Sequence, residues 1–154
     1  MRSLVLVTLC AAAALAQSKY TGPRPPKPDL PYLLHASNLE PTEAVEAKEN
    51  QRKDDILYTV PGASSPAKTP LASPVLLMQA DKLDASRLQL YKLESRNGQR
   101  EILFKKKKPA RPIRVEITRA GENIYRIEVG ESLENGEYSL TPEGSNQVFC
   151  FQVY

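Results

Sequence analysis

Short strand-like patterns recur along the second half of this chain and constrain its fold most strongly. From Val75 onward, apolar stretches bounded by turn-forming residues follow one another every eight to twelve residues, which is the spacing of an all-β protein. The cleanest examples, 113–117 and 125–129, alternate apolar and polar residues as half-buried strands do. Helical patterns do not alternate with these stretches, so a parallel α/β sheet is not expected.

Three neighbouring stretches predict particular strands. The continuous apolar run 75–78 predicts a central strand that is covered on both faces. The stretch 88–94 alternates and then slips in phase, which we interpret as a β-bulge. Asn97 and Gly98 follow it and precede the strand-like stretch 101–104. Because both residues tolerate positive φ, they predict a hairpin with a type I′ turn.

The C-terminal region carries the most specific pattern. Leu133, Gly136, Tyr138 and Leu140 form the motif Leu-x-x-Gly-x-Tyr-x-Leu, which resembles the tyrosine corner of immunoglobulin-like and fibronectin-type domains. The resemblance implies an antiparallel immunoglobulin-like β-sandwich of about seven or eight strands, with the Tyr138 hydroxyl bonded to upstream backbone. The chain has no Trp, and the position two after Tyr138 is not Cys. Antibody-type domains are therefore excluded, and a bacterial-style or fibronectin-type variant is closer.

The first sixteen residues predict a cleaved signal peptide. Arg2 precedes an apolar run that ends in Ala14-Leu15-Ala16, which matches an A-x-A cleavage site. The run is shorter than the roughly 20 residues that a transmembrane anchor needs. We therefore expect a secreted or periplasmic protein of bacterial type, and the mature chain to begin at Gln17.

Residues 17–55 form a Pro-rich and charged segment ahead of the predicted β-sandwich domain at 56–154. Ten of the thirteen prolines lie between Pro23 and Pro74. Since proline fixes φ and removes a backbone donor, we expect this segment to be mostly irregular, extended at its start, and to act as a spacer. A ligand for a proline-reading partner is the alternative. The stretch 63–73 is expected to be a long surface connection.

One helix is predicted in this segment, at 42–49. Thr42 can cap it, and Glu43 and Glu46 lie near its positive end. The stretch has little apolar surface, so a polar edge strand is the competing interpretation. The stretch 54–60 is expected to be the first strand of the sandwich.

Basic residues cluster between positions 96 and 114, where eight basic residues and one acidic residue give a local charge of +7. The cluster comprises Arg96, Arg100, Lys105, Lys106, Lys107, Lys108, Arg111 and Arg114. One interpretation is a basic edge that binds a polyanion, such as an acidic glycan or an anionic membrane surface. The simpler interpretation is that lysines at a sheet edge prevent edge-to-edge pairing. Nucleic acid is not expected, because no aromatic residues are interleaved for base stacking.

Cys150 is the single cysteine of the expected mature chain, because Cys10 leaves with the signal peptide. Alternation places Phe149 and Phe151 toward the core and Cys150 on the other face of the last strand. If Cys150 is exposed, it can link two copies through an intermolecular disulfide. The alternative is a buried, unreactive thiol.

No catalytic motif is recognised, and no metal site or cofactor is expected. His35 is the single histidine, and we interpret it as a docking or surface residue rather than as a catalytic base. We expect a non-catalytic binding or structural protein of the cell envelope or extracellular space, contacting a protein partner or a surface glycan. The alternatives are a subunit of a fibre or pilus-like homo-oligomeric assembly, and a small secreted hydrolase with a carboxylate site.

Overall fold

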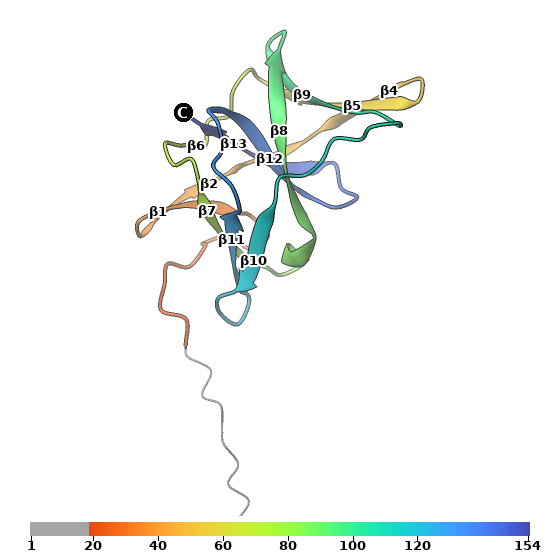
Figure 1. Ribbon diagram of the computed structural model, residues 1–154. Helices are drawn as coiled ribbons and strands as arrows, with labels where there is room; N and C mark the ends of the chain where they lie inside the picture. The colour runs from red at the N-terminus through yellow and green to blue at the C-terminus, as the bar shows by residue number, and fades with distance from the viewer. Residues whose placement is uncertain (1–18) are drawn as a thin grey trace, which may run out of the picture.

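The computed structural model describes residues 19–154, and the expected signal peptide at 1–16 lies outside these residues. The described residues form thirteen strands in two sheets, with one turn of 3-10 helix, η1 (Ala85–Arg87) (Figure 1). The expected all-β fold with antiparallel strands is confirmed. The strands are more numerous than the seven or eight predicted, because short strands also form in the N-terminal half.

The first sheet has five antiparallel strands in the order β10, β11, β7, β1, β2. Their bounds are β1 Tyr32–His35, β2 Asn38–Pro41, β7 Val75–Gln79, β10 Val115–Arg119 and β11 Ile124–Val129. The central position predicted for β7 is confirmed, and its middle residues 76–78 are buried. The two alternating stretches of the sequence form β10 and β11, which pair directly with each other.

The second sheet has eight strands, seven of them in the order β3, β13, β12, β8, β9, β5, β4. The eighth, β6, pairs with β13 in parallel. Their bounds are β3 Glu43–Glu46, β4 Lys48–Arg52, β5 Asp55–Pro61, β6 Lys68–Thr69, β8 Leu88–Arg96, β9 Gln99–Phe104, β12 Gly136–Pro142 and β13 Gln147–Val153. The outermost strands β3 and β4 are separated in the chain by Ala47 alone, so the sheet folds back on itself.

Strand β8 changes partner along its length and divides this sheet into two parts. Residues 88–93 pair with β12, whereas residues 94–96 pair with β9. Beyond this point β4, β5 and β9 project away from the other strands, at the upper right of Figure 1. We call these three strands the wing and the remainder of the described chain the body.

The main core fills the space between the two sheets of the body. Each sheet contributes apolar side chains from its inner face, as two packed layers require. Its fully buried members include Leu33, Leu76, Met78, Ile127, Leu90, Leu140, Phe149 and Phe151. The prediction that Phe149 and Phe151 face the core is thus confirmed.

The helix predicted at 42–49 is wrong, and the competing interpretation as polar edge strand is confirmed. The stretch forms β3, paired with β13, and the start of β4, paired with β5. Each is an outermost strand of the second sheet. The local preference for helix is weak, and hydrogen bonding to a strand distant in sequence outweighs it.

The Pro-rich segment contributes more to the fold than its composition predicts. Strands β1 to β4 all precede residue 56, and Tyr32 and Leu33 of β1 are buried. The two sheets therefore include residues on both sides of the predicted boundary at 56. The connection 63–73 is likewise not only a surface loop, since it contains β6 and the buried residues Ser65 and Thr69.

Two turn predictions are confirmed in detail. Asn97 and Gly98 have φ values of 53° and 76°, and they join β8 to β9 in an antiparallel hairpin. The Tyr138 hydroxyl donates to the backbone carbonyl of Glu134 at 2.7 Å, which is the upstream hydrogen bond that the tyrosine-corner motif implies. The Tyr138 ring also stacks on Phe151, with centroids 5.7 Å apart.

The bulge predicted in β8 is not needed to explain its sequence pattern. Residues 88–93 pair with β12 in unbroken register. Leu88 and Leu90 face the main core, whereas Leu93 faces a second apolar cluster on the opposite side of the sheet. The apolar pattern slips because the strand is buried on different faces at its two ends.

Candidate functional site

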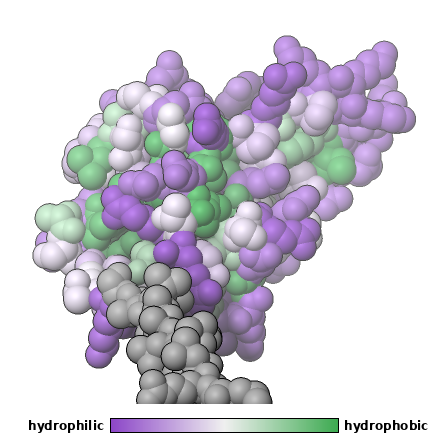
Figure 2. Space-filling model, turned by 60° about the horizontal axis from the view of Figure 1, so that its bottom comes forward, coloured by the Kyte–Doolittle hydropathy of each residue, from purple (hydrophilic) through white to green (hydrophobic). Residues whose placement is uncertain are grey.

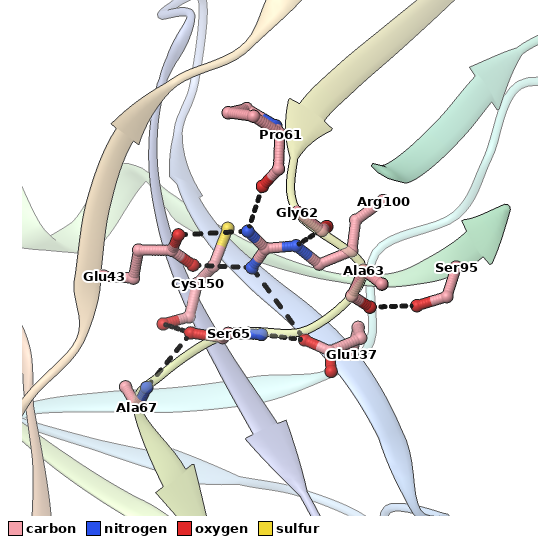
Figure 3. A network of polar contacts seen from close by, with 10 residues as sticks. All are labelled: Glu43, Pro61, Gly62, Ala63, Ser65, Ala67, Ser95, Arg100, Glu137 and Cys150. Carbon is pink, nitrogen blue, oxygen red and sulfur yellow. Dashed lines mark hydrogen bonds and ion pairs between the residues drawn. The ribbon is translucent and has the colours of Figure 1, made fainter. Parts of the chain in front are cut away.

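A buried arginine joins the wing to the body (Figure 3). Arg100 on β9 has no exposed side-chain surface. Its Nη1 and Nη2 atoms lie 2.5 and 3.0 Å from the two carboxylate oxygens of Glu43 on β3. The guanidinium also donates to the carbonyl oxygens of Pro61 and Gly62, at 2.7 and 3.0 Å. Two-pronged pairing with a carboxylate adds geometric specificity to the attraction between the charges.

Glu137 on β12 brings a second carboxylate to this network. Its Oε2 accepts a hydrogen bond from the Ser65 backbone N–H at 3.0 Å and lies 3.9 Å from Nη1 of Arg100. Burial raises the pKa of Glu137, although the Ser65 N–H and Arg100 act in the opposite direction. Burial lowers the pKa of Arg100, but the neighbouring carboxylates raise it above its ordinary value. The guanidinium therefore stays charged.

Cys150 lies beside this network (Figure 3). On β13 it is paired with Glu43 on one side and with Ser139 on the other. The residue has no exposed surface, and burial raises the pKa of its thiol to about 12, against the influence of Arg100. A thiol that stays protonated at neutral pH is a weak nucleophile. The folded protein thus does not present Cys150 for an intermolecular disulfide.

The network acts as a clamp between strands that are far apart in sequence. Four protein oxygens occupy the donors of Arg100, and they come from β3 and from the end of β5 with its following residue. A guanidinium satisfied in this way has little capacity left for a ligand. Its position fixes how the wing lies against β3, β12 and β13, and this in turn shapes the space beside it.

A cleft of about 360 Å³ opens between the wing and the body. It is lined by strands β4, β5, β8, β9, β12 and β13, and by the turn at 142–146. Its floor is aliphatic and consists of Val60, Leu93, Ile102 and Val148, which belong to the second apolar cluster together with Cys150. In Figure 2 the wing, at the upper right, carries hydrophobic surface bordered by hydrophilic side chains. An apolar hollow with a polar border has the general character of a ligand site.

Three aromatic rings form one side of the cleft. Phe104 makes edge-to-face contacts with Tyr58 and Tyr91, with centroid separations of 5.5 and 5.3 Å and interplanar angles of 88° and 72°. The Tyr91 hydroxyl donates to the Gln89 side chain at 2.9 Å. Burial, followed by the nearby Glu49 carboxylate, raises the pKa of Tyr58. All three rings remain partly exposed to the cleft.

The charged residues that line the cleft are acidic. They are Glu49 and Glu143, and no Lys, Arg or His is among the lining residues. Arg87 pairs with Glu143 at 3.2 Å, whereas Glu49 takes part in none of the ion pairs formed within residues 19–154. The electrostatic character of the cleft is therefore opposite to that of the basic segment next to it in sequence.

The structure divides the predicted basic edge. Arg100 does not belong to it, because its buried ion pair removes it from the surface. The other members, Arg96, Lys105, Lys106, Lys107, Lys108, Arg111 and Arg114, are exposed. The four lysines follow Phe104 at the end of β9, and Lys106 pairs with Asp54 of the β4–β5 hairpin at 3.7 Å. Pairing between exposed side chains of this kind is worth little energetically.

His35 takes part in docking within the body. Its Nε2 lies 2.9 Å from the Thr69 hydroxyl, which connects β1 to β6. Within residues 19–154, no group of three or more His, Cys, Asp or Glu residues is arranged to hold a metal ion. In the same part of the chain, no helix has the length and apolar character needed to cross a membrane.

No family model, no curated protein and no solved structure matches this chain. The interpretation of the cleft therefore depends on its own geometry. Sequence reasoning singled out none of its functional candidates, namely Glu49, Tyr58, Tyr91 and Phe104. One feature of the sequence pointed toward the cleft, namely the phase slip in β8. Such a slip marks a strand with apolar surface on its second face.

Proposed function

We propose that this chain is an exported, non-catalytic binding protein of the cell envelope or extracellular space that contacts a protein partner or a surface glycan. One observation carries the proposal, namely the aromatic-lined cleft between the wing and the body. The signal-peptide pattern at 1–16 supports the extracytoplasmic location.

The cleft differs from a packing defect in its composition. Partly exposed tyrosine rings combine apolar faces with hydroxyl groups, and such residues are enriched where proteins bind partners. Aliphatic side chains form the floor, while carboxylate, amide and hydroxyl groups lie around it. An apolar side chain or the flat face of a sugar ring can rest on such rings while its polar groups meet the border.

The family proposal is an immunoglobulin-like or fibronectin-type variant. It is supported by two packed sheets and by the hydrogen bond from Tyr138 to the Glu134 carbonyl. This architecture hosts many unrelated binding functions. It therefore agrees with a binding role without identifying the ligand.

The test is an NMR titration of isotope-labelled residues 17–154 with a soluble peptidoglycan disaccharide-peptide, neutral oligosaccharides and short peptides. We expect saturable shifts of the amides that border the cleft with at least one of these probes. Tyr91→Ser should abolish them, whereas Tyr154→Ser, which removes an exposed ring outside the cleft, should not. Shifts confined to 105–108, or no saturable shift with any probe, would overturn the proposed use of the cleft.

A further inference from the structure

The arrangement of the three rings in the cleft suggests what kind of group it binds. Phe104 stands nearly perpendicular to Tyr58 and is steeply inclined to Tyr91, so aromatic surfaces of different orientation border the same hollow. The face of an aromatic ring carries negative electrostatic potential. A cation placed over such faces is attracted, most strongly where water is partly excluded.

The charges around the rings favour the same kind of ligand. The two charged lining residues, Glu49 and Glu143, are carboxylates. Arg87 forms an exposed ion pair with Glu143. Glu49 on β4 forms no ion pair within residues 19–154 and is the cross-strand neighbour of Tyr58, and its carboxylate contributes to the raised pKa of that tyrosine. An anionic ligand would meet repulsion here, and a neutral ligand would make no use of this charge.

The aliphatic floor restricts the class of cation. A primary ammonium has three N–H donors that need acceptors when it leaves water. Val60, Leu93, Ile102 and Val148 provide no side-chain acceptors, and the hydroxyls of Ser139 and Thr141, which also line the cleft, hydrogen-bond to each other at 2.7 Å. A quaternary ammonium has no N–H donors, and its methyl groups can rest on aliphatic and aromatic surface.

We infer that the cleft binds a quaternary ammonium group against Tyr58, Tyr91 and Phe104, with Glu49 as its counter-charge. The inference rests on the proposed function, because it specifies the ligand chemistry of the same cleft. The group can belong to a free small molecule such as choline or to a choline lipid headgroup, and both sources present the same trimethylammonium cation.

The experiment is calorimetric titration of residues 17–154 with choline and with 3,3-dimethyl-1-butanol, a neutral molecule of the same shape. Choline should bind, and the alcohol about tenfold or more weakly, as expected from the strength of cation–aromatic attraction. Equal affinity for the two would overturn the inference while leaving a binding cleft. Binding of neither, while a probe of the NMR panel still binds, would also overturn the inference alone. Failure of every probe would overturn the proposed function as well.

Two variants separate the counter-charge from general electrostatics. Glu49→Gln should weaken choline binding severalfold, while Glu46→Gln, an exposed glutamate on β3 that does not line the cleft, should leave the affinity within twofold. Equal losses in the two variants would contradict the role of Glu49.

A third variant tests the aromatic rings. Tyr91→Leu should weaken choline binding about tenfold, and its unfolding curve shows whether the fold is retained.

The source of the cation is distinguished by competition. Phosphatidylcholine vesicles that displace bound choline would identify the lipid headgroup as an accessible source. Vesicles that leave choline bound would restrict the site to small soluble molecules. Either result supports a quaternary ammonium site, provided that choline itself binds.

Discussion

The body and the wing are stabilised in different ways. The body is held by apolar side chains packed between two sheets, where Leu33, Leu76 and Phe149 are fully or almost fully buried. The wing meets the body through a much smaller apolar cluster and is clamped to it by the ion pair of Arg100 with Glu43. Apolar packing fills space without strong directional preference, whereas a two-pronged ion pair fixes orientation. The wing can therefore be positioned while a cleft beside it remains open.

Removing the clamp should have the largest effect on stability. Arg100→Met leaves Glu43 and Glu137 without their cation, and breaking a buried pair in this way costs about 3–5 kcal/mol of unfolding free energy. Denaturant unfolding measures the loss, and hydrogen exchange should show it first in the wing. Lys92→Met is the matched control, since its 2.7 Å pair with Glu134 is exposed and should cost less than about 1 kcal/mol. Similar losses in the two variants would contradict the contrast between the regions.

Removing apolar volume from the core of the body should lower the free energy of unfolding slightly less. We expect this loss to affect the whole body. Leu76 on β7 is fully buried in the main core, so Leu76→Ala should lower the unfolding free energy by about 2–5 kcal/mol. Because β7 lies at the centre of the first sheet, hydrogen exchange should accelerate throughout the body. Acceleration limited to β7 would show that the body does not unfold as one unit.

Tyr138→Phe should have a smaller effect. It removes the hydroxyl that donates to the Glu134 carbonyl but keeps the ring stacked on Phe151. We expect a loss of about 1 kcal/mol in chemical unfolding, as for one intramolecular hydrogen bond. Tyr154→Phe, at an exposed residue, should change stability by less than about 0.5 kcal/mol. A loss far below 1 kcal/mol for Tyr138→Phe would show that the corner bond contributes little.

Two carboxyl groups of the body, one of them beside the clamp, should affect stability with opposite pH dependence, and these are the smallest effects we expect. Away from the clamp, burial of Asp29 opposes its ionisation, but three backbone N–H groups outweigh it and lower the pKa below 3.8. Its contribution to stability is present above pH 3.8 and is lost as the pH falls through the lowered pKa. At the clamp, burial raises the pKa of Glu137 above 4.5, so its contribution is lost as the pH rises from 4.5 through the raised pKa.

Urea unfolding between pH 3 and pH 8 checks these two signs. Asp29→Asn should reduce the loss of stability on the acid side. Glu137→Gln should reduce the decline that sets in as the pH rises above 4.5. The same pH dependence in both variants would show that the two carboxylates are not in the contrasting environments described above.

Local patterns predicted much of the body. Alternation along β10 and β11 reflects one buried face, and the Asn97-Gly98 turn follows from the positive φ that both residues accept. For β3 and the start of β4 the sequence favoured a helix, because these strands contain few apolar residues. Their strand structure depends on hydrogen bonds to β13 and β5. Pairing of this kind is decided by partners that are distant in the chain.

The candidate cleft could not be predicted in the same way. Arg100 looked like one member of a basic stretch, since the carboxylate that pairs with it, Glu43, lies 57 residues earlier. Tyr58, Tyr91 and Phe104 each read as an ordinary strand residue. They come to line one hollow because three strands of a folded sheet meet there.

Local patterns were enough to predict the all-β class, the hairpin at Asn97-Gly98 and the corner at Tyr138, because each depends on local periodicity or backbone conformation. The burial of Arg100, the burial of Cys150 and the cleft beside them could be seen only in the folded protein. These features depend on long-range pairing and on the burial of charged groups. The energy of each is set by neighbouring residues that come together only in the folded chain.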